Sequence, residues 1–167
     1  MNSMAAPERD PVEKNQIKVW YRFVPREGWL PYDTEGLWAT RLSEDTARVE
    51  NVPFLQDGVA QGETVRFVTD ADGLHWARER VKASGNCTVR VLSVPSGPLG
   101  RSAEAVYQRL APFGLVGEVF SEELPLVALT VPADADLGQV KALLVRGREQ
   151  GWWHFEEACV TDAWRDA

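Results

Sequence analysis

The sequence predicts an α+β protein: a small N-terminal antiparallel β-barrel, SH3-like, packed on a C-terminal ferredoxin-like βαββαβ domain. Two observations predict this class. Short segments of alternating polarity, with no room for a long helix, fill residues 17–83. From residue 84 onward, strand patterns are interrupted by two segments with helical spacing of apolar residues. We therefore predict domains over 17–83 and 84–161, a disordered tail over 1–16 and a second tail over 162–167.

Five short strands are predicted in the first domain, where aromatic and β-branched residues alternate with polar ones between turn signals. They occupy IKVWYRFV, TEGLWATRL, TARVEN and the two halves of QGETVRFVTDADGLHWARERV. The last two are joined at Asp72-Gly73, because Asp-Gly supplies the positive φ angles of a tight hairpin. Closure into a barrel removes exposed strand edges, and Trp20 and Trp76 are expected to fill its interior.

The second domain is predicted from the order strand, helix, strand, strand, helix, strand. CTVRVLSV is the first strand, and Ser102 caps a helix that ends at Gly114. LVGEVF and LPLVALTVP follow, Asp134 caps a second helix that ends at Gly151, and WWHFEEACV is the last strand. In this topology the first and last strands are antiparallel neighbours, so Cys87 and Cys159 should have Cα atoms within about 8 Å.

Composition and charge limit the function classes. The chain has 167 residues, with 18 Lys plus Arg against 25 Asp plus Glu, and a net charge of −7. We expect no nucleic-acid binding, because phosphate is repelled overall and the predicted strands CTVRVLSV and LPLVALTVP contain no aromatic residue on which a base could stack. The longest apolar stretch is half the roughly 20 residues of a membrane-spanning helix, so we expect no membrane partner. No signal-peptide pattern opens the chain, so we expect a cytoplasmic protein with Cys87 and Cys159 as thiols.

The sequence resembles the bacterial family known as domain of unknown function 4265. The resemblance rests on TEGLWATRL, NVPF, GVAQGETV, SGNCTVRV and the terminal WWHFEEA, dispersed in the same order over nearly the whole chain. The chain departs from the family pattern at Glu63, where Asp is favoured, and at Asn86-Cys87, where His-Ser is favoured. The resemblance implies a bacterial, intracellular setting and supplies no mechanism.

Carboxylates are the candidate acid/base residues, with Glu35 and Glu63 as the catalytic candidates. Arg90 on the neighbouring strand is expected to form a structural ion pair with Glu156. Gly58–Glu63 is interpreted as a barrel turn, with an anion-binding backbone nest as the alternative. We expect neither a metal nor a cofactor, because two His and two Cys occur without ligand spacing and no phosphate-binding motif is present.

The seven tryptophans exceed what a small barrel can bury, so some should line an interface between the halves, between subunits of a homodimer, or around a ligand. Our leading hypothesis is a non-catalytic binding or accessory protein that recognises a protein or small ligand where its halves meet. Its expected binding residues are Trp29, Glu35, Trp38, Asn51 and Phe54. An immunity-like partner of a basic toxin fits the net charge of −7. The alternative is a small acid/base enzyme that uses Glu35 or Glu63 in a Trp-lined pocket.

Overall fold

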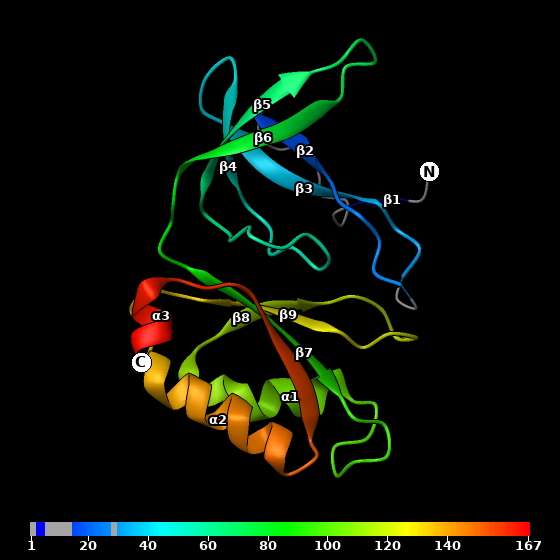
Figure 1. The fold of residues 1–167 in the computed structure, drawn as a ribbon, viewed down its shortest axis with the longest axis vertical. Coiled ribbons are helices and arrows are strands. Elements are labelled where there is room, and N and C mark those ends of the chain that lie inside the picture. Colours follow the sequence, from blue (N-terminus) through cyan, green and yellow to red (C-terminus); the bar gives the residue numbers. More distant parts are fainter. Residues whose placement is uncertain (1–2, 6–14, 28–29) are drawn as a thin grey trace. The chain divides into compact units, whose positions relative to one another are not determined.

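The chain divides into two compact units, residues 1–84 and 85–167. The computed structural model describes residues 3–5, 15–27 and 30–167. The division falls one residue beyond the predicted domain boundary, and each unit has a sheet and a hydrophobic core of its own (Figure 1).

The first unit is a closed β-barrel with one added strand. Its strands within the described residues are β1 (Ser3–Ala5), β2 (Gln16–Arg22), β3 (Thr34–Arg41), β4 (Thr46–Val49), β5 (Thr64–Thr69) and β6 (His75–Lys82). The sheet order is β1-β3-β2-β6-β5-β4, and a further pairing of β3 with β4 closes the barrel. Closure leaves only β1 outside the ring, paired to β3.

Alternation along the strands explains the barrel core. On β2, Val19 and Tyr21 are buried and face inward, while Lys18 and Trp20 lie on the other face. The inward residues of the other strands join them in one apolar cluster: Leu37, Ala39, Ala47, Val49, Val59, Val65 and Phe67. The predicted hairpin at Asp72-Gly73 is confirmed, since β5 and β6 pair across it and Gly73 has φ +82°.

Two tryptophans expected inside the barrel lie on its outer face. Trp20 stands opposite Trp76 across the β2–β6 pair and on the same face of β2 as Lys18. The Lys18 Nζ lies over the rings of Trp20 and Trp38, at 5.6 and 4.7 Å from their centroids. The prediction of barrel filling by Trp20 and Trp76 is therefore wrong, because strand alternation gives the interior to their smaller neighbours.

The second unit packs helices against one four-stranded sheet. Its described elements are β7 (Cys87–Ser93), α1 (Ala103–Leu110), the 3-10 helix η1 (Ala111–Phe113), β8 (Val116–Val119), β9 (Val127–Val131), α2 (Leu137–Glu149), β10 (Trp153–Cys159) and α3 (Asp162–Asp166). All pairs in the order β10-β7-β9-β8 are antiparallel. Val106 and Leu110 of α1 and Leu144 of α2 are buried with the sheet residues Val89 and Trp153 in one core.

Side-chain caps begin the helices. Ser102 caps α1 as predicted, since its Oγ accepts a hydrogen bond from the Ala105 N–H at 3.0 Å. The second helix begins later than predicted: Asp136, and not Asp134, accepts from the Gln139 N–H at 3.1 Å. The predicted tail over 162–167 is also wrong, because α3 is capped by Thr161 and buries Trp164 in the core.

The predicted fold class is wrong. The described chain is mostly β, in two sheets with short helices. The first unit is not an antiparallel, SH3-like barrel, because β2 and β6 pair in parallel and β1 pairs in parallel with β3. The second unit has a four-stranded antiparallel sheet, and its helical elements include η1 and α3, which lie outside a βαββαβ pattern, so the ferredoxin-like description is not retained. Residues 3–5 of the predicted disordered tail form a strand, and the rest of that tail before Asn15 lies outside the described residues.

The first and last strands of the second unit are antiparallel neighbours, as predicted. Cys159 of β10 is opposite Thr88, the residue after Cys87. Cys87 and Cys159 form no disulfide with each other, and Cys87 is buried in the core. In the part of the chain that the structure describes, no helix is long and apolar enough to cross a membrane.

Candidate functional site

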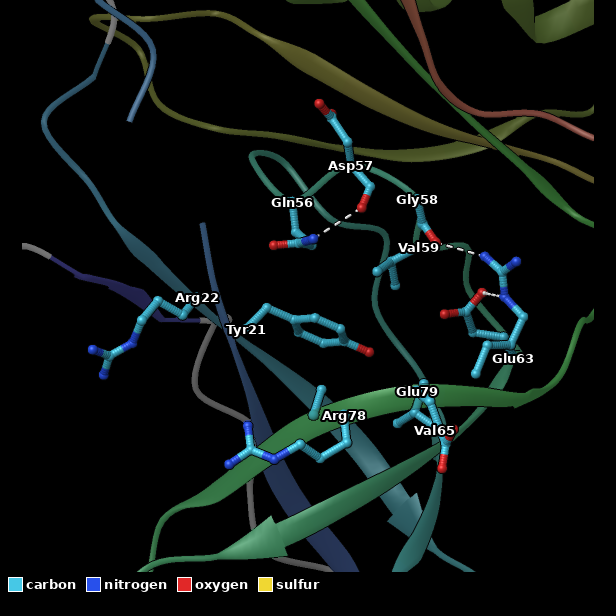
Figure 2. A pocket seen from close by; sticks show the side chains of 12 residues that line it. Tyr21, Arg22, Gln56, Asp57, Gly58, Val59, Glu63, Val65, Arg78 and Glu79 are labelled. Atoms are coloured by element: carbon cyan, nitrogen blue, oxygen red, sulfur yellow. Dashed lines mark hydrogen bonds and ion pairs between the residues drawn. The ribbon is translucent and has the colours of Figure 1, made fainter. Parts of the chain in front are cut away.

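A pocket opens in the wall of the barrel where β2 and β6 stop pairing. These strands pair at only two positions, Val19 with His75 and Trp20 with Trp76. The residues that follow on both strands line a pocket of about 260 Å³, together with the loop after β4 (Figure 2). Its lining is Tyr21, Arg22, Gln56, Asp57, Gly58, Val59, Glu63, Val65, Ala77, Arg78, Glu79 and Arg80.

Tyr21 places a buried hydroxyl in this pocket. Only 9% of the residue is exposed, and its hydroxyl has no hydrogen-bond partner among the described residues. Burial, and then the negative charge of Glu63, raise the pKa of Tyr21 far above its usual range. The hydroxyl therefore stays protonated near neutral pH, where it can both donate and accept a hydrogen bond.

Glu63 lies beside Tyr21 and holds the turn that closes the pocket. Its Oε2 accepts hydrogen bonds from the Ala60 N–H at 3.2 Å and the Arg80 Nε at 2.9 Å. A second nitrogen of Arg80 donates to the Gly58 carbonyl at 2.5 Å. Gly58 and Gly62 have φ angles of +76° and +89°, so the block Gly58–Glu63 is the turn that was predicted. The other carboxylate oxygen, Oε1, makes no hydrogen bond among the described residues.

Burial dominates the electrostatics of Glu63 and raises its pKa, although Ala60 and Arg80 act in the opposite direction. A carboxyl whose folded-state pKa lies above its unfolded-state value stabilises the fold below the unfolded pKa. This stability is lost as the pH rises through the folded pKa. We therefore expect wild type to gain stability relative to Glu63→Gln on going from about pH 7 to about pH 4. Melting temperatures of both proteins across this range test the sign; a constant difference would contradict it.

Arg78 lines the pocket and forms no ion pair with any described residue. It is exposed and makes no hydrogen bond with any described residue either. It also lines a neighbouring hollow of about 370 Å³ with Arg22, Asp70, Trp76 and Ala77. In that hollow the Trp76 Nε1 donates to the Asp70 carboxylate at 2.8 Å, and the Arg22 guanidinium lies over the Trp76 ring at 4.7 Å.

Glu35 lies outside this pocket and fastens the loop that forms one wall of it. The side chain is buried, and its two oxygens accept three backbone hydrogen bonds, from Phe54 at 2.7 Å, Leu55 at 3.1 Å and Gln56 at 2.9 Å. Asn51 acts on the same loop, since its Oδ1 accepts from the Trp38 N–H at 2.9 Å. Glu35 is thus a positioning residue for the loop, with its carboxylate already engaged.

The structure brings only some of the five predicted binding residues into contact with one another. Two pairs of them are in contact in the first unit: the Asn51 side chain accepts from the Trp38 N–H, the Glu35 side chain accepts from the Phe54 N–H, and Phe54 is buried. Trp38 is half-buried beneath Lys18 on the outer face. Trp29 lies outside the described residues.

In the second unit, Arg90 and Glu156 form an ion pair across β7 and β10. They are directly opposite in the register, and the Arg90 Nη1 lies 2.9 Å from the Glu156 Oε1. Arg90 is buried, whereas the neighbouring Glu157 accepts a hydrogen bond from the indole of Trp164. Among the described residues, no group of three or more His, Cys, Asp or Glu comes together as a metal site.

The comparisons place the chain in a family. The model of the family described as Domain of unknown function (DUF4265) matches residues 35–155, which is most of the chain. The chain belongs to the DUF4265 family. The resemblance seen in the sequence is thereby confirmed.

No curated protein matches this DUF4265 chain. A crystal structure of a hypothetical protein from Neisseria gonorrhoeae is similar to it, with a TM-score of 0.69 and 18% sequence identity. The similarity covers 89% of this chain and 96% of that chain. At this identity the comparison supports the fold alone.

Within this DUF4265 protein, the sequence analysis found Glu63, but the pocket residues that it missed include Tyr21, Arg78 and Arg80. Arg78 and Arg80 lie inside the range matched by the family, and Tyr21 precedes it. The alternation of Tyr21 with Lys18 and Trp20 was a sufficient signal that its ring faces the barrel interior. The two arginines gave no such signal, because they lie on a strand whose exposed end carries charges at successive positions.

Proposed function

We propose that the first unit of this DUF4265 protein is a non-catalytic binding module that takes a small polar molecule into the pocket beside Tyr21. The observation that carries the proposal is the buried Tyr21 hydroxyl, which has no partner among the described residues and lines a pocket of about 260 Å³. Leaving a buried hydroxyl without a hydrogen bond costs about 1–3 kcal/mol. A ligand that bonds to it would recover this cost.

Other groups around the pocket support a binding role. Val59, Val65 and the Tyr21 ring supply apolar surface, while the Glu63 Oε1 and the Arg78 guanidinium offer an acceptor and a set of donors. Small-molecule sites combine apolar surface with polar groups that fix the orientation of the ligand, and charged or polar side chains make up more than half of this lining. The pocket volume lies just below the usual range of such sites, which favours a small metabolite over a large cofactor.

A binding screen with two variants tests this proposal. Ligand-observed NMR against a panel of small alcohols, amides and carboxylic acids should reveal compounds that bind wild type. Tyr21→Phe should weaken their binding about tenfold, the value of one buried hydrogen bond. Ala77→Leu should abolish binding, because Ala77 lines the pocket and a larger side chain would fill it.

The matched control is Tyr107→Phe, which removes a hydroxyl from the second unit and should leave binding unchanged. Melting temperatures show whether each variant is folded, and Tyr21→Phe should be at least as stable as wild type because it loses an unsatisfied hydroxyl. The proposal would be overturned if no compound of the panel binds, or if the compounds that bind have the same affinity for wild type, Tyr21→Phe and Ala77→Leu.

An acid/base enzyme that uses Glu63 is the second candidate. The observation that favours it is a buried carboxyl with a raised pKa and a free Oε1 in a pocket. Against it, Arg80 holds the other oxygen, and the pocket is lined by Tyr21 with no tryptophan. The screen separates the two: a binder recovered chemically unchanged after long incubation supports binding, whereas conversion that Glu63→Gln abolishes supports the enzyme.

A cytoplasmic location is part of the proposal, supported by Cys87 and Cys159, which form no disulfide with each other. Recognition of a protein partner where the halves meet, including an immunity-like role, stays a prediction from the sequence, as does a homodimer. The Glu35 and Asn51 contacts give those residues a structural role that needs no partner.

A further inference from the structure

We propose that the ligand of this pocket is a small hydroxycarboxylate, a monoanion whose carboxylate pairs with Arg78 and whose hydroxyl reaches Tyr21 and Glu63. This inference rests on the proposed binding function and specifies the chemical class of the ligand. It follows from the charges of the lining, the arrangement of its polar groups and the apolar surface between them.

Of the three arginines in the lining, Arg80 is paired with Glu63 and the Arg22 guanidinium lies over the Trp76 ring, so Arg78 is the one we assign to an anion. Each acidic residue of the lining is already paired with an arginine: Asp57 with Arg26 at 3.3 Å, Glu63 with Arg80 at 2.9 Å and Glu79 with Arg66 at 2.6 Å. Arg78 has no such partner among the described residues. A carboxylate matches the planar donor set of a guanidinium and would complete the pairing.

The polar groups lie at two ends of the pocket. Figure 2 shows the guanidinium of Arg78 on the side of Arg22, while the Tyr21 hydroxyl points the other way, toward Glu63. The Tyr21 ring, Val59, Val65 and Ala77 supply the apolar lining. The arrangement fits an elongated molecule with an anionic group, a short apolar chain and a polar end.

The polar end matches a hydroxyl better than a charged group. A hydroxyl can donate to the Glu63 Oε1 while it accepts from the Tyr21 hydroxyl, and so satisfies both atoms at once. A second anionic group there would be repelled by the buried Glu63 carboxylate. An ammonium group would lie next to Arg80, which already neutralises Glu63.

Three matched probes test whether the ligand is a hydroxycarboxylate. 4-Hydroxybutyrate carries a carboxylate and a hydroxyl, butyrate carries the carboxylate alone, and 1,4-butanediol carries hydroxyls alone. Dissociation constants come from chemical-shift titrations of the full chain. We expect 4-hydroxybutyrate to bind wild type about tenfold more tightly than either other probe. Arg78→Gln should weaken 4-hydroxybutyrate and butyrate about tenfold and leave 1,4-butanediol unchanged.

Arg48→Gln is the matched control, because Arg48 is an arginine of the same barrel that pairs with Glu50, and neither residue lines the pocket. It should leave all three affinities unchanged. If 1,4-butanediol binds as tightly as 4-hydroxybutyrate and Tyr21→Phe weakens both, the binding function stands and the carboxylate class is wrong. If Arg78→Gln has no effect on the carboxylates, the inference is overturned. Screening hits that depend on neither Tyr21 nor Ala77 overturn the binding function itself.

Discussion

Replacement of Glu35 by alanine should lower the free energy of unfolding by about 4 kcal/mol. Its carboxylate accepts the backbone N–H groups of Phe54, Leu55 and Gln56, and the residue is 1% exposed. Alanine would leave these donors without their acceptor, and each unsatisfied buried donor costs about 1–3 kcal/mol before any relaxation of the loop. Because the same loop forms a wall of the pocket, ligand binding should weaken as well.

Glu50→Ala is a matched control in the same region. Glu50 accepts hydrogen bonds from the Thr40 hydroxyl at 2.9 Å and the Arg48 Nε at 3.0 Å, but its partners are side chains and its own side chain is 29% exposed. Exposed pairs of this kind contribute at most about 1 kcal/mol. Urea denaturation of both variants measures the difference. Equal losses for Glu35→Ala and Glu50→Ala would show that Glu35 is not the acceptor that holds the loop.

Local signals in the sequence predicted the strands of the barrel, but not the parallel pairing of β2 with β6, which we call the seam. The alternation on β2 and the Asp72-Gly73 turn located their elements, because both depend on neighbouring residues. The parallel seam depends on the strand count. Five strands from β2 to β6, joined as antiparallel neighbours, alternate in direction, so the first and the last run the same way. When such a meander closes, its seam must be parallel, as β2 and β6 are.

The pocket follows from this seam, which is why the sequence did not predict it. Alternation could place the Tyr21 ring inside the barrel, but its lack of a hydrogen-bond partner depends on where the loop after β4 lies. Glu63 was a candidate because it is a carboxylate next to a turn, and its role depends on Arg80, 17 residues along the chain. The tail around Trp164 was a different kind of error, since Thr161 was a recognisable cap: its hydroxyl accepts from the Trp164 N–H at 3.2 Å.

Gly147→Ala should destabilise the second unit by about 3 kcal/mol, although glycine to alanine normally stabilises a helix interior. Gly147 is buried in α2, and a Cβ there would lie 2.6 Å from the indole nitrogen of Trp153. Trp153 cannot easily move away, because it is fully buried and its Nε1 donates to the Leu144 carbonyl at 3.0 Å. The added methyl group must therefore displace either the ring or the helix.

At Gly138, in the first turn of the same helix, substitution by alanine should stabilise the protein. This glycine is exposed, and the nearest atom to a Cβ there is a carboxylate oxygen of Asp136 at 3.7 Å. Gly138→Ala should raise the free energy of unfolding by about 0.5 kcal/mol. Trp153→Phe replaces the indole by a smaller phenyl ring without the nitrogen. In this background, Gly147→Ala should lower the free energy of unfolding by less than about 1 kcal/mol. If the cost is the same in both backgrounds, contact with the indole is not its cause, and the close packing of α2 on β10 does not depend on this glycine.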